Sequence, residues 1–114
     1  MQQIKKALGI DGVLTETSVW RYVPLKGEQG AQIDLLLDRQ DRCINVCEIK
    51  FSTDDYVITK KYAAELDNKL TVFRTATKTK KTLFLTMITT YGTNRNEYFT
   101  GRVQGEVIME NLFS

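Results

Sequence analysis

The sequence predicts an α/β fold in a single domain, and two observations lead to this prediction. Segments with helical period and segments with strand character follow one another in the order helix, three strands, helix, strand, strand. The second helix lies between two apolar strands, and a helical connection of this kind joins parallel neighbours in one sheet. A chain of 114 residues with 42% hydrophobic and 26% charged residues is typical of one globular domain.

The first quarter of the chain predicts a helix and a strand. Residues 1–9 place apolar side chains on one helical face and end in Gly9, which favours a helix end. We expect residues 10–17 to be a loop and residues 18–23 to be the first strand. Residues 24–32 contain two glycines and predict a turn.

A β-hairpin is the centre of the predicted fold. Two runs rich in Ile, Val and Leu flank a short polar connection, so we expect residues 33–38 to pair with residues 43–51. Successive side chains of a strand point to opposite faces of the sheet. Asp34 should therefore face away from Ile33 and Leu35, and Glu48 should share one face with Lys50.

The second half of the chain predicts a helix followed by two strands. We expect the helix over residues 59–76, with its charged side chains mostly away from an apolar stripe. The stripe comprises Tyr62, Ala63, Leu66, Leu70, Phe73 and Ala76. Residues 82–91 are nearly continuously apolar and predict a strand buried on both faces. After a loop, residues 102–113 predict a last strand or a strand with a turn.

Composition excludes several classes of site. The chain has no histidine, which excludes histidine-dependent triads and the usual zinc sites. Cys43 and Cys47 would lie ~13 Å apart along one strand, too far for a disulfide between them. The chain has no P-loop motif for ATP hydrolysis. It also has no apolar run of membrane-spanning length and no signal-peptide core, so we expect a cytoplasmic protein without membrane contact.

The hairpin carries a candidate metal site. Asp34, Glu48 and Lys50 would converge on an otherwise apolar sheet, where a buried carboxylate is costly unless a partner or a metal compensates it. Two carboxylates suit Mg²⁺, which keeps several waters and accepts phosphate oxygens as its other ligands. Lysine beside such a site can position a water or stabilise charge on a phosphate.

These residues also carry a family resemblance. Asp34 followed by Glu48-Ile49-Lys50 resembles the D…(D/E)-x-K signature of the PD-(D/E)XK nuclease superfamily. The sequence around the motif, GAQIDLLLDR and then CEIKFS, is similar to the C-terminal domain that follows an AAA-type ATPase in a family of prokaryotic ATPases. The likeness covers residues 4–113. It implies one nuclease-like domain over residues 1–114, part of a longer ATPase, with a restriction-endonuclease-like mixed sheet of about five strands flanked by helices (αβββαβ).

The resemblance implies a Mg-dependent or Mn-dependent phosphodiesterase acting on DNA. Asp34 and Glu48, with the backbone carbonyl of Ile49, would hold the metal ion, and Lys50 would orient or activate the attacking water. Active members of the superfamily often have a further acidic residue on the first helix, which this chain lacks; Asp11 and Glu16 are the nearest candidates, both in the expected loop. Many members also carry Gln or Lys on the helix after the lysine motif.

A basic segment supports nucleic acid as the partner. Residues 60–81 hold seven basic and two acidic residues, and we expect Lys60, Lys61 and Lys69 to contact the phosphate backbone. The alternative for this segment is an ordinary solvated helix face.

Two other interpretations of the hairpin motif remain open. One is a catalytically inactive module that binds nucleic acid or docks a partner, such as an N-terminal ATPase domain of the parent protein. The other is a structural ion pair between Glu48 and Lys50 at a sheet edge, which would contribute about 0–1 kcal/mol.

Overall fold

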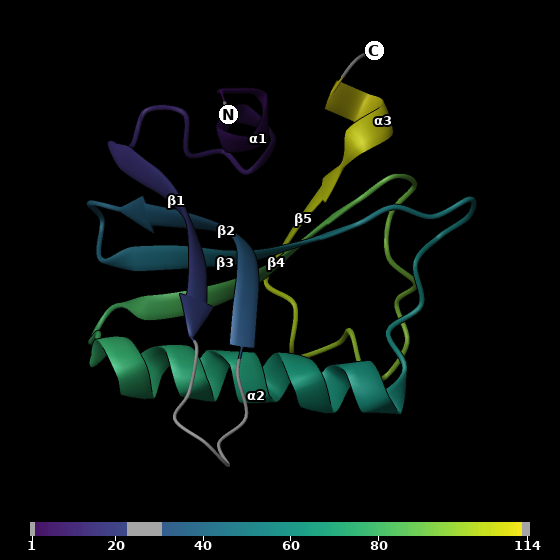
Figure 1. Ribbon diagram of the computed structural model, residues 1–114. Coiled ribbons are helices and arrows are strands. Elements are labelled where there is room, and N and C mark those ends of the chain that lie inside the picture. Colours follow the sequence, from purple (N-terminus) through teal and green to yellow (C-terminus); the bar gives the residue numbers. More distant parts are fainter. Residues whose placement is uncertain (1, 23–30, 113–114) are drawn as a thin grey trace.

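The computed structural model describes residues 2–22 and 31–112, which form a mixed α/β fold around a five-stranded sheet (Figure 1). The strand order in the sheet follows the chain, β1-β2-β3-β4-β5. The elements are α1 (Gln2–Ala7), β1 (Thr15–Tyr22), β2 (Ala31–Arg39), β3 (Cys43–Lys50), α2 (Lys60–Thr77), β4 (Thr82–Thr89), β5 (Gly105–Ile108) and α3 (Met109–Leu112).

The predicted hairpin and the predicted parallel unit are both confirmed. β2 and β3 are antiparallel, with Leu35 opposite Cys47 and Asp38 opposite Ile44. β3 and β4 are parallel over their full length, and α2 is the connection between them. β3 is therefore the central strand of the sheet, with β2 and β4 hydrogen-bonded on its two sides.

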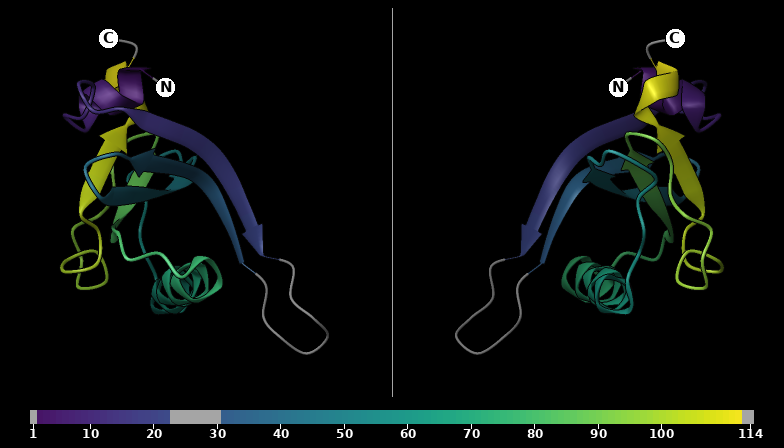
Figure 2. Two further views of the ribbon diagram at one scale, coloured as in Figure 1. Left: turned by 90° about the vertical axis from the view of Figure 1, so that its left-hand side faces the viewer. Right: turned by 90° about the vertical axis from the view of Figure 1, so that its right-hand side faces the viewer.

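The long helix α2 covers one face of the sheet, and α1 and α3 lie on the other side (Figure 2). The apolar stripe of α2 and the segment before it are buried against the sheet through the residues Ile58, Tyr62, Ala63, Leu66 and Phe73. On the opposite face, α1 and α3 help to cover a core formed by the residues Ile10, Leu35, Leu37, Cys47, Ile88 and Val107. The sheet is thus buried on both faces at β3 and β4, as the apolar run over residues 82–91 predicts.

The limits of α2 follow from local chemistry. Thr59 is the N-cap, and its hydroxyl accepts a hydrogen bond from the backbone N–H of Tyr62 at 3.1 Å. Lys78 ends the helix in the left-handed region with φ 56°, and its N–H donates to the carbonyl of Arg74. The predicted helix over residues 59–76 is therefore confirmed to within a residue.

A β-bulge bends β2 at Asp34. Ser18 of β1 lies opposite Leu36, but Trp20 lies opposite Ile33, so Val19 faces two residues of β2 instead of one. Such a bulge interrupts the alternation of side chains and increases the local bend. Figures 1 and 2 show β2 changing direction along its length and curving, together with β1, toward the side of α2.

The bulge corrects one prediction from the sequence. Ile33 and Leu35 do not share a face, because Ile33 packs with Leu36 and Phe73 under α2, whereas Leu35 packs with Cys47 on the other side of the sheet. Asp34 lies at the point where the alternation changes.

Other boundaries also differ from the prediction. β1 begins at Thr15, so Glu16 belongs to a strand and not to a loop. β3 ends at Lys50, and Phe51, which was expected inside the strand, is 79% exposed. Residues 109–112 form the short helix α3 rather than a continuation of β5. Most of the glycine-containing turn, residues 23–30, lies outside the described residues. None of the helices in the described part has the length and apolar character of a membrane span.

Candidate active site

Glu48 is the most buried member of the predicted triad. Because Ile44, Val46 and Glu48 alternate with their neighbours along β3, Glu48 points to the face covered by α2, and 0% of its surface is exposed. Its Oε1 accepts hydrogen bonds from the Tyr62 hydroxyl at 3.1 Å and from Lys69 Nζ at 2.5 Å. Its Oε2 is buried and has no hydrogen-bond partner among residues 2–22 and 31–112.

Two residues of α2 create this environment, and both lie on one face of the helix. Tyr62, Leu66, Lys69 and Phe73 follow one another at steps of four, three and four residues, so they form a single stripe toward the sheet. Only 22% of the Lys69 side chain is exposed, and it forms an ion pair with Glu48. The expectation that Lys69 lies away from the apolar stripe is therefore wrong.

Asp34 reaches the same region from the bend of β2. The paired register of β2 and β3 ends at Leu35 and Cys47, and beyond it Asp34 Oδ2 accepts the backbone N–H of Ile49 at 2.9 Å. The carboxylate thus binds the residue between Glu48 and Lys50. Its other oxygen, Oδ1, has no hydrogen-bond partner in the described part of the chain.

Lys50 contacts the ring of Tyr62 and forms no ion pair with Glu48. Its ammonium nitrogen is 4.8 Å from the centroid of the Tyr62 ring, a cation–π contact. The same ring packs edge-on against Tyr56 at 5.8 Å between centroids. Within the described residues Lys50 forms no ion pair, so its charge remains available to a ligand.

The interpretation of Glu48 and Lys50 as an ion pair at a sheet edge is wrong on both counts. Glu48 pairs with Lys69, and β3 is central in the sheet.

The electrostatic environment reflects a buried negative charge. Burial, followed by the nearby Glu48 carboxylate, raises the pKa of the Tyr62 hydroxyl far above its ordinary value, which keeps it a donor. Burial and then Glu48 also raise the pKa of the Cys47 thiol to about 12. The charge of Asp34 acts in the same direction on both groups, so both predicted carboxylates influence one small region.

The two carboxylates, Asp34 and Glu48, match the number of carboxylate ligands that Mg²⁺ commonly takes. No group of three or more His, Cys, Asp or Glu side chains able to hold a metal occurs among residues 2–22 and 31–112. Mg²⁺ is bound in proteins through one or two carboxylates, with waters and phosphate oxygens completing its shell. Glu48 Oε2 and Asp34 Oδ1 are the carboxylate oxygens of this pair that have no partner within the described residues.

A third acidic residue does not complete the site. Asp11 lies exposed in the turn after α1, and Glu16 lies opposite Asp38, four residues along β2 from Asp34. The sequence named these two residues only as the nearest acidic candidates. The fold does not bring either of them to the site.

The lysines predicted to bind nucleic acid divide into two groups. Lys60 and Lys61 lie exposed in the first turn of α2, without an acidic partner among the described residues. Lys69 is instead engaged by Glu48. The spacing of Lys69 from Tyr62 and Leu66 places it on the stripe, whereas contact of Lys69 with nucleic acid stays a prediction.

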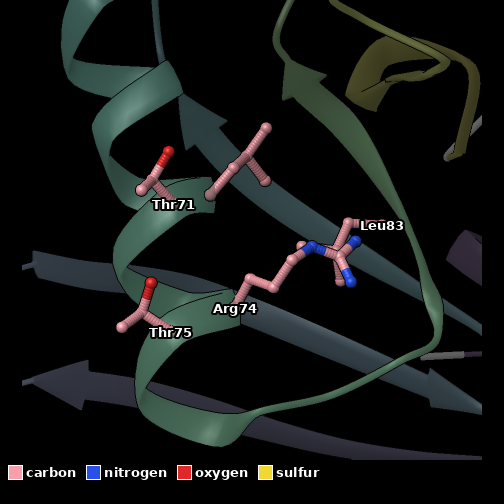
Figure 3. Close-up of a pocket in the computed structure, with 5 residues that line it drawn as sticks. Thr71, Arg74, Thr75 and Leu83 are labelled. Carbon is pink, nitrogen blue, oxygen red and sulfur yellow. The ribbon is translucent and has the colours of Figure 1, made fainter.

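A hollow on α2 is lined by residues other than these (Figure 3). Leu70, Thr71, Arg74 and Thr75 of α2 line it together with Leu83 of β4. The Arg74 guanidinium donates to the backbone carbonyls of residues 79 and 81, so it is used to hold the connection after α2. None of its described lining residues carries a carboxylate, so they add no metal ligand to the candidate site.

Comparisons of the chain with family models, with curated proteins and with solved structures give no match. Asp34, Glu48 and Lys50, through their motif and their geometry, are therefore the features of the chain that point to a function.

Proposed function

We propose that the chain is a metal-dependent phosphodiesterase domain of the restriction-endonuclease-like type that acts on DNA. Asp34 and Glu48 would hold one Mg²⁺ or Mn²⁺ ion, with the carbonyl of Ile49 as a further ligand. The observation that carries the proposal is the buried oxygen Oε2 of Glu48, which has no hydrogen-bond partner in the part of the chain that the structure describes. The order helix, three strands, helix, strand supports the proposed fold type.

The burial of Glu48 is the physical reason for this proposal. Buried polar groups in native proteins are nearly always hydrogen-bonded, and an exception calls for an explanation such as a bound ion. A carboxylate in the middle of a sheet also contributes little to stability compared with an apolar residue of similar size. Its presence in β3, one residue from the backbone N–H that Asp34 binds, favours a role in binding.

Each residue has a distinct role in the proposed reaction. Mg²⁺ supplies, when bound, Lewis-acid activation of the phosphate and the attacking water. Asp34 and Glu48 provide the negative charge that attracts the ion, and Tyr62 fixes the orientation of the Glu48 carboxylate. Lys50, held over the Tyr62 ring, can orient the attacking water or stabilise charge that develops on the phosphate.

DNA is the polyanion that we propose as substrate. Lys60 and Lys61 project from the first turn of α2, the same helix that supplies Tyr62 to the site. Exposed lysines of this kind contact the phosphate backbone without reading the bases. They would hold a duplex or a single strand beside Lys50.

Cleavage assays test the proposed function. Purified protein is incubated with plasmid and with single-stranded DNA in Mg²⁺, Mn²⁺ or EDTA, and Lys50→Ala and Asp34→Asn are tested in parallel. We expect metal-dependent nicking by the wild type and its loss in both variants. Equal activity of Lys50→Ala and wild type would remove Lys50 from the chemistry.

A second function is favoured by one specific observation. Lys69 already neutralises Glu48, and such a pair can persist in a protein that no longer binds metal. In that case the domain would be an inactive module that binds nucleic acid or docks an ATPase domain of the parent protein. Calorimetric titration with Mg²⁺ distinguishes the two functions, because a docking module does not need a metal at Asp34 and Glu48.

A further inference from the structure

We propose that Lys69 is an internal counter-ion that occupies Glu48 in place of the metal ion and leaves it when the metal binds. The inference depends on the proposed metal site, and it adds a residue that sets the affinity of that site. Lys69 would be a positioning residue, because it acts on the metal through Glu48.

The geometry supports exchange between the ammonium group and a metal ion. Lys69 Nζ binds Oε1 at 2.5 Å, and Oε2 of the same carboxylate has no partner in the described ranges of the chain. A single positive charge thus balances a carboxylate whose second oxygen has no hydrogen-bond partner among the described residues. Lys50 is only two residues from Glu48 in the chain, yet it lies over the Tyr62 ring instead. Lys69 alone therefore compensates the buried charge among the described residues.

Electrostatics makes the ammonium and the metal competitors. A divalent ion at Glu48 would lie close to the Lys69 ammonium, and two cations in a buried, low-dielectric position repel one another strongly. The Lys69 side chain is 22% exposed and long, so its ammonium can move to solvent while its methylene groups stay in contact with the protein. The Tyr62 hydroxyl would then still hold Oε1.

Two consequences follow for the protein. Without metal, the ion pair with Lys69 prevents Glu48 from being an uncompensated buried charge, so the domain can fold before it meets a metal ion. When a metal ion binds, part of the binding free energy is used to displace Lys69. The affinity for the metal is therefore lower than the two carboxylates alone would give.

Titration of Lys69→Met with Mn²⁺ tests the inference. The variant keeps the apolar length of the side chain and removes the ammonium. We expect the dissociation constant for Mn²⁺, measured by calorimetry, to be at least about tenfold lower than in the wild type, since no cation must be displaced. In EDTA the variant should melt at a lower temperature, and Mn²⁺ should raise its melting temperature more than it raises that of the wild type.

Controls separate this effect from a general change in charge. Lys80→Met removes the same charge from an exposed residue outside every ion pair of the described part, and it should leave the Mn²⁺ dissociation constant unchanged. If Lys69→Met does not fold in EDTA, it is refolded with and without Mn²⁺, and recovery that requires Mn²⁺ supports the inference. Lys69→Gln provides a polar substitute for the same titration.

The outcomes distinguish this inference from the proposed function. Equal Mn²⁺ affinity in wild type and Lys69→Met would overturn the role of Lys69 and leave the metal site standing. Weaker binding in Lys69→Met would overturn it as well, because Lys69 would then support the metal. Absence of binding in wild type, Lys69→Met and Lys69→Gln would overturn both the inference and the metal site.

Discussion

The hydroxyl of Tyr62 offers a clean test of how Glu48 is held. Tyr62→Phe removes the donor to Glu48 Oε1 and leaves the ring in place. The ring contacts with Lys50 at 4.8 Å and with Tyr56 at 5.8 Å do not require the hydroxyl. The substitution therefore isolates one hydrogen bond to a buried carboxylate.

The expected magnitude follows from the burial of the acceptor. Hydrogen bonds to charged groups contribute about 1.5–3 kcal/mol. Lys69 remains bound to the same oxygen, so Oε1 is not left without a partner and the loss should lie in the lower half of this range. We expect the free energy of unfolding to fall by about 2 kcal/mol, which corresponds to a decrease of roughly 8 °C in melting temperature for a domain of this size.

Urea denaturation of the wild type, Tyr62→Phe and Tyr56→Phe measures the effect. Tyr56 is half-buried beside Tyr62, and its hydroxyl makes no hydrogen bond to the described residues, so its removal should cost less than about 0.5 kcal/mol. The slope of the free energy against urea should be the same in all three proteins. A change below about 0.5 kcal/mol for Tyr62→Phe would refute the idea that this bond holds Glu48.

Three further predictions concern the fold and its dependence on pH. Leu66→Ala, at a residue of α2 with 0% exposure, should lower the free energy of unfolding by about 2–5 kcal/mol in urea denaturation, and a loss below about 1 kcal/mol would contradict the packing of α2 on the sheet. Thr59→Ala removes the N-cap and should cost about 1 kcal/mol, whereas Thr59→Ser should cost much less. Burial raises the pKa of Cys47 from 9.0 to about 12, so between these pH values the unfolded chain binds fewer protons than the folded one and stability should fall as pH rises. Denaturation at a series of pH values checks this, and Cys47→Ala should reduce the slope; an identical slope in that variant would contradict it.

The regular parts of the fold could be predicted because their signals are local. The helix α2 has an apolar stripe of several turns and a threonine N-cap, and both are visible in the sequence. The apolar run that contains β4 predicts a strand in the interior of a sheet, because a strand that is apolar on both faces must be covered on both. Together these two elements predict the parallel unit with β3, which the structure confirms.

The bend at Asp34 could not be predicted in this way. It depends on the pairing of β2 with β1, where Val19 faces two residues, and the register between distant strands is not encoded in the local pattern. The result is that Asp34 binds the backbone of Ile49 instead of simply alternating with Ile33 and Leu35.

Lys69 shows a different limit of sequence reasoning. A lysine on an amphipathic helix is usually assigned to the solvent face, since a buried ammonium is costly. Here the buried carboxylate of Glu48 compensates that cost, and the compensation comes from another element of the fold. The spacing of Lys69 from Tyr62 can be read in the sequence, but the pairing of Lys69 with Glu48 cannot.

The most direct test of the metal site is a crystal of the wild-type protein soaked in Mn²⁺ and measured for anomalous scattering. We predict one anomalous peak at about 2.1 Å from Glu48 Oε2 and from a carboxylate oxygen of Asp34, with the Lys69 ammonium moved away from Glu48. The absence of a peak at these oxygens at saturating Mn²⁺, with Lys69 still bound to Glu48, would contradict the proposal that Asp34 and Glu48 form a metal site.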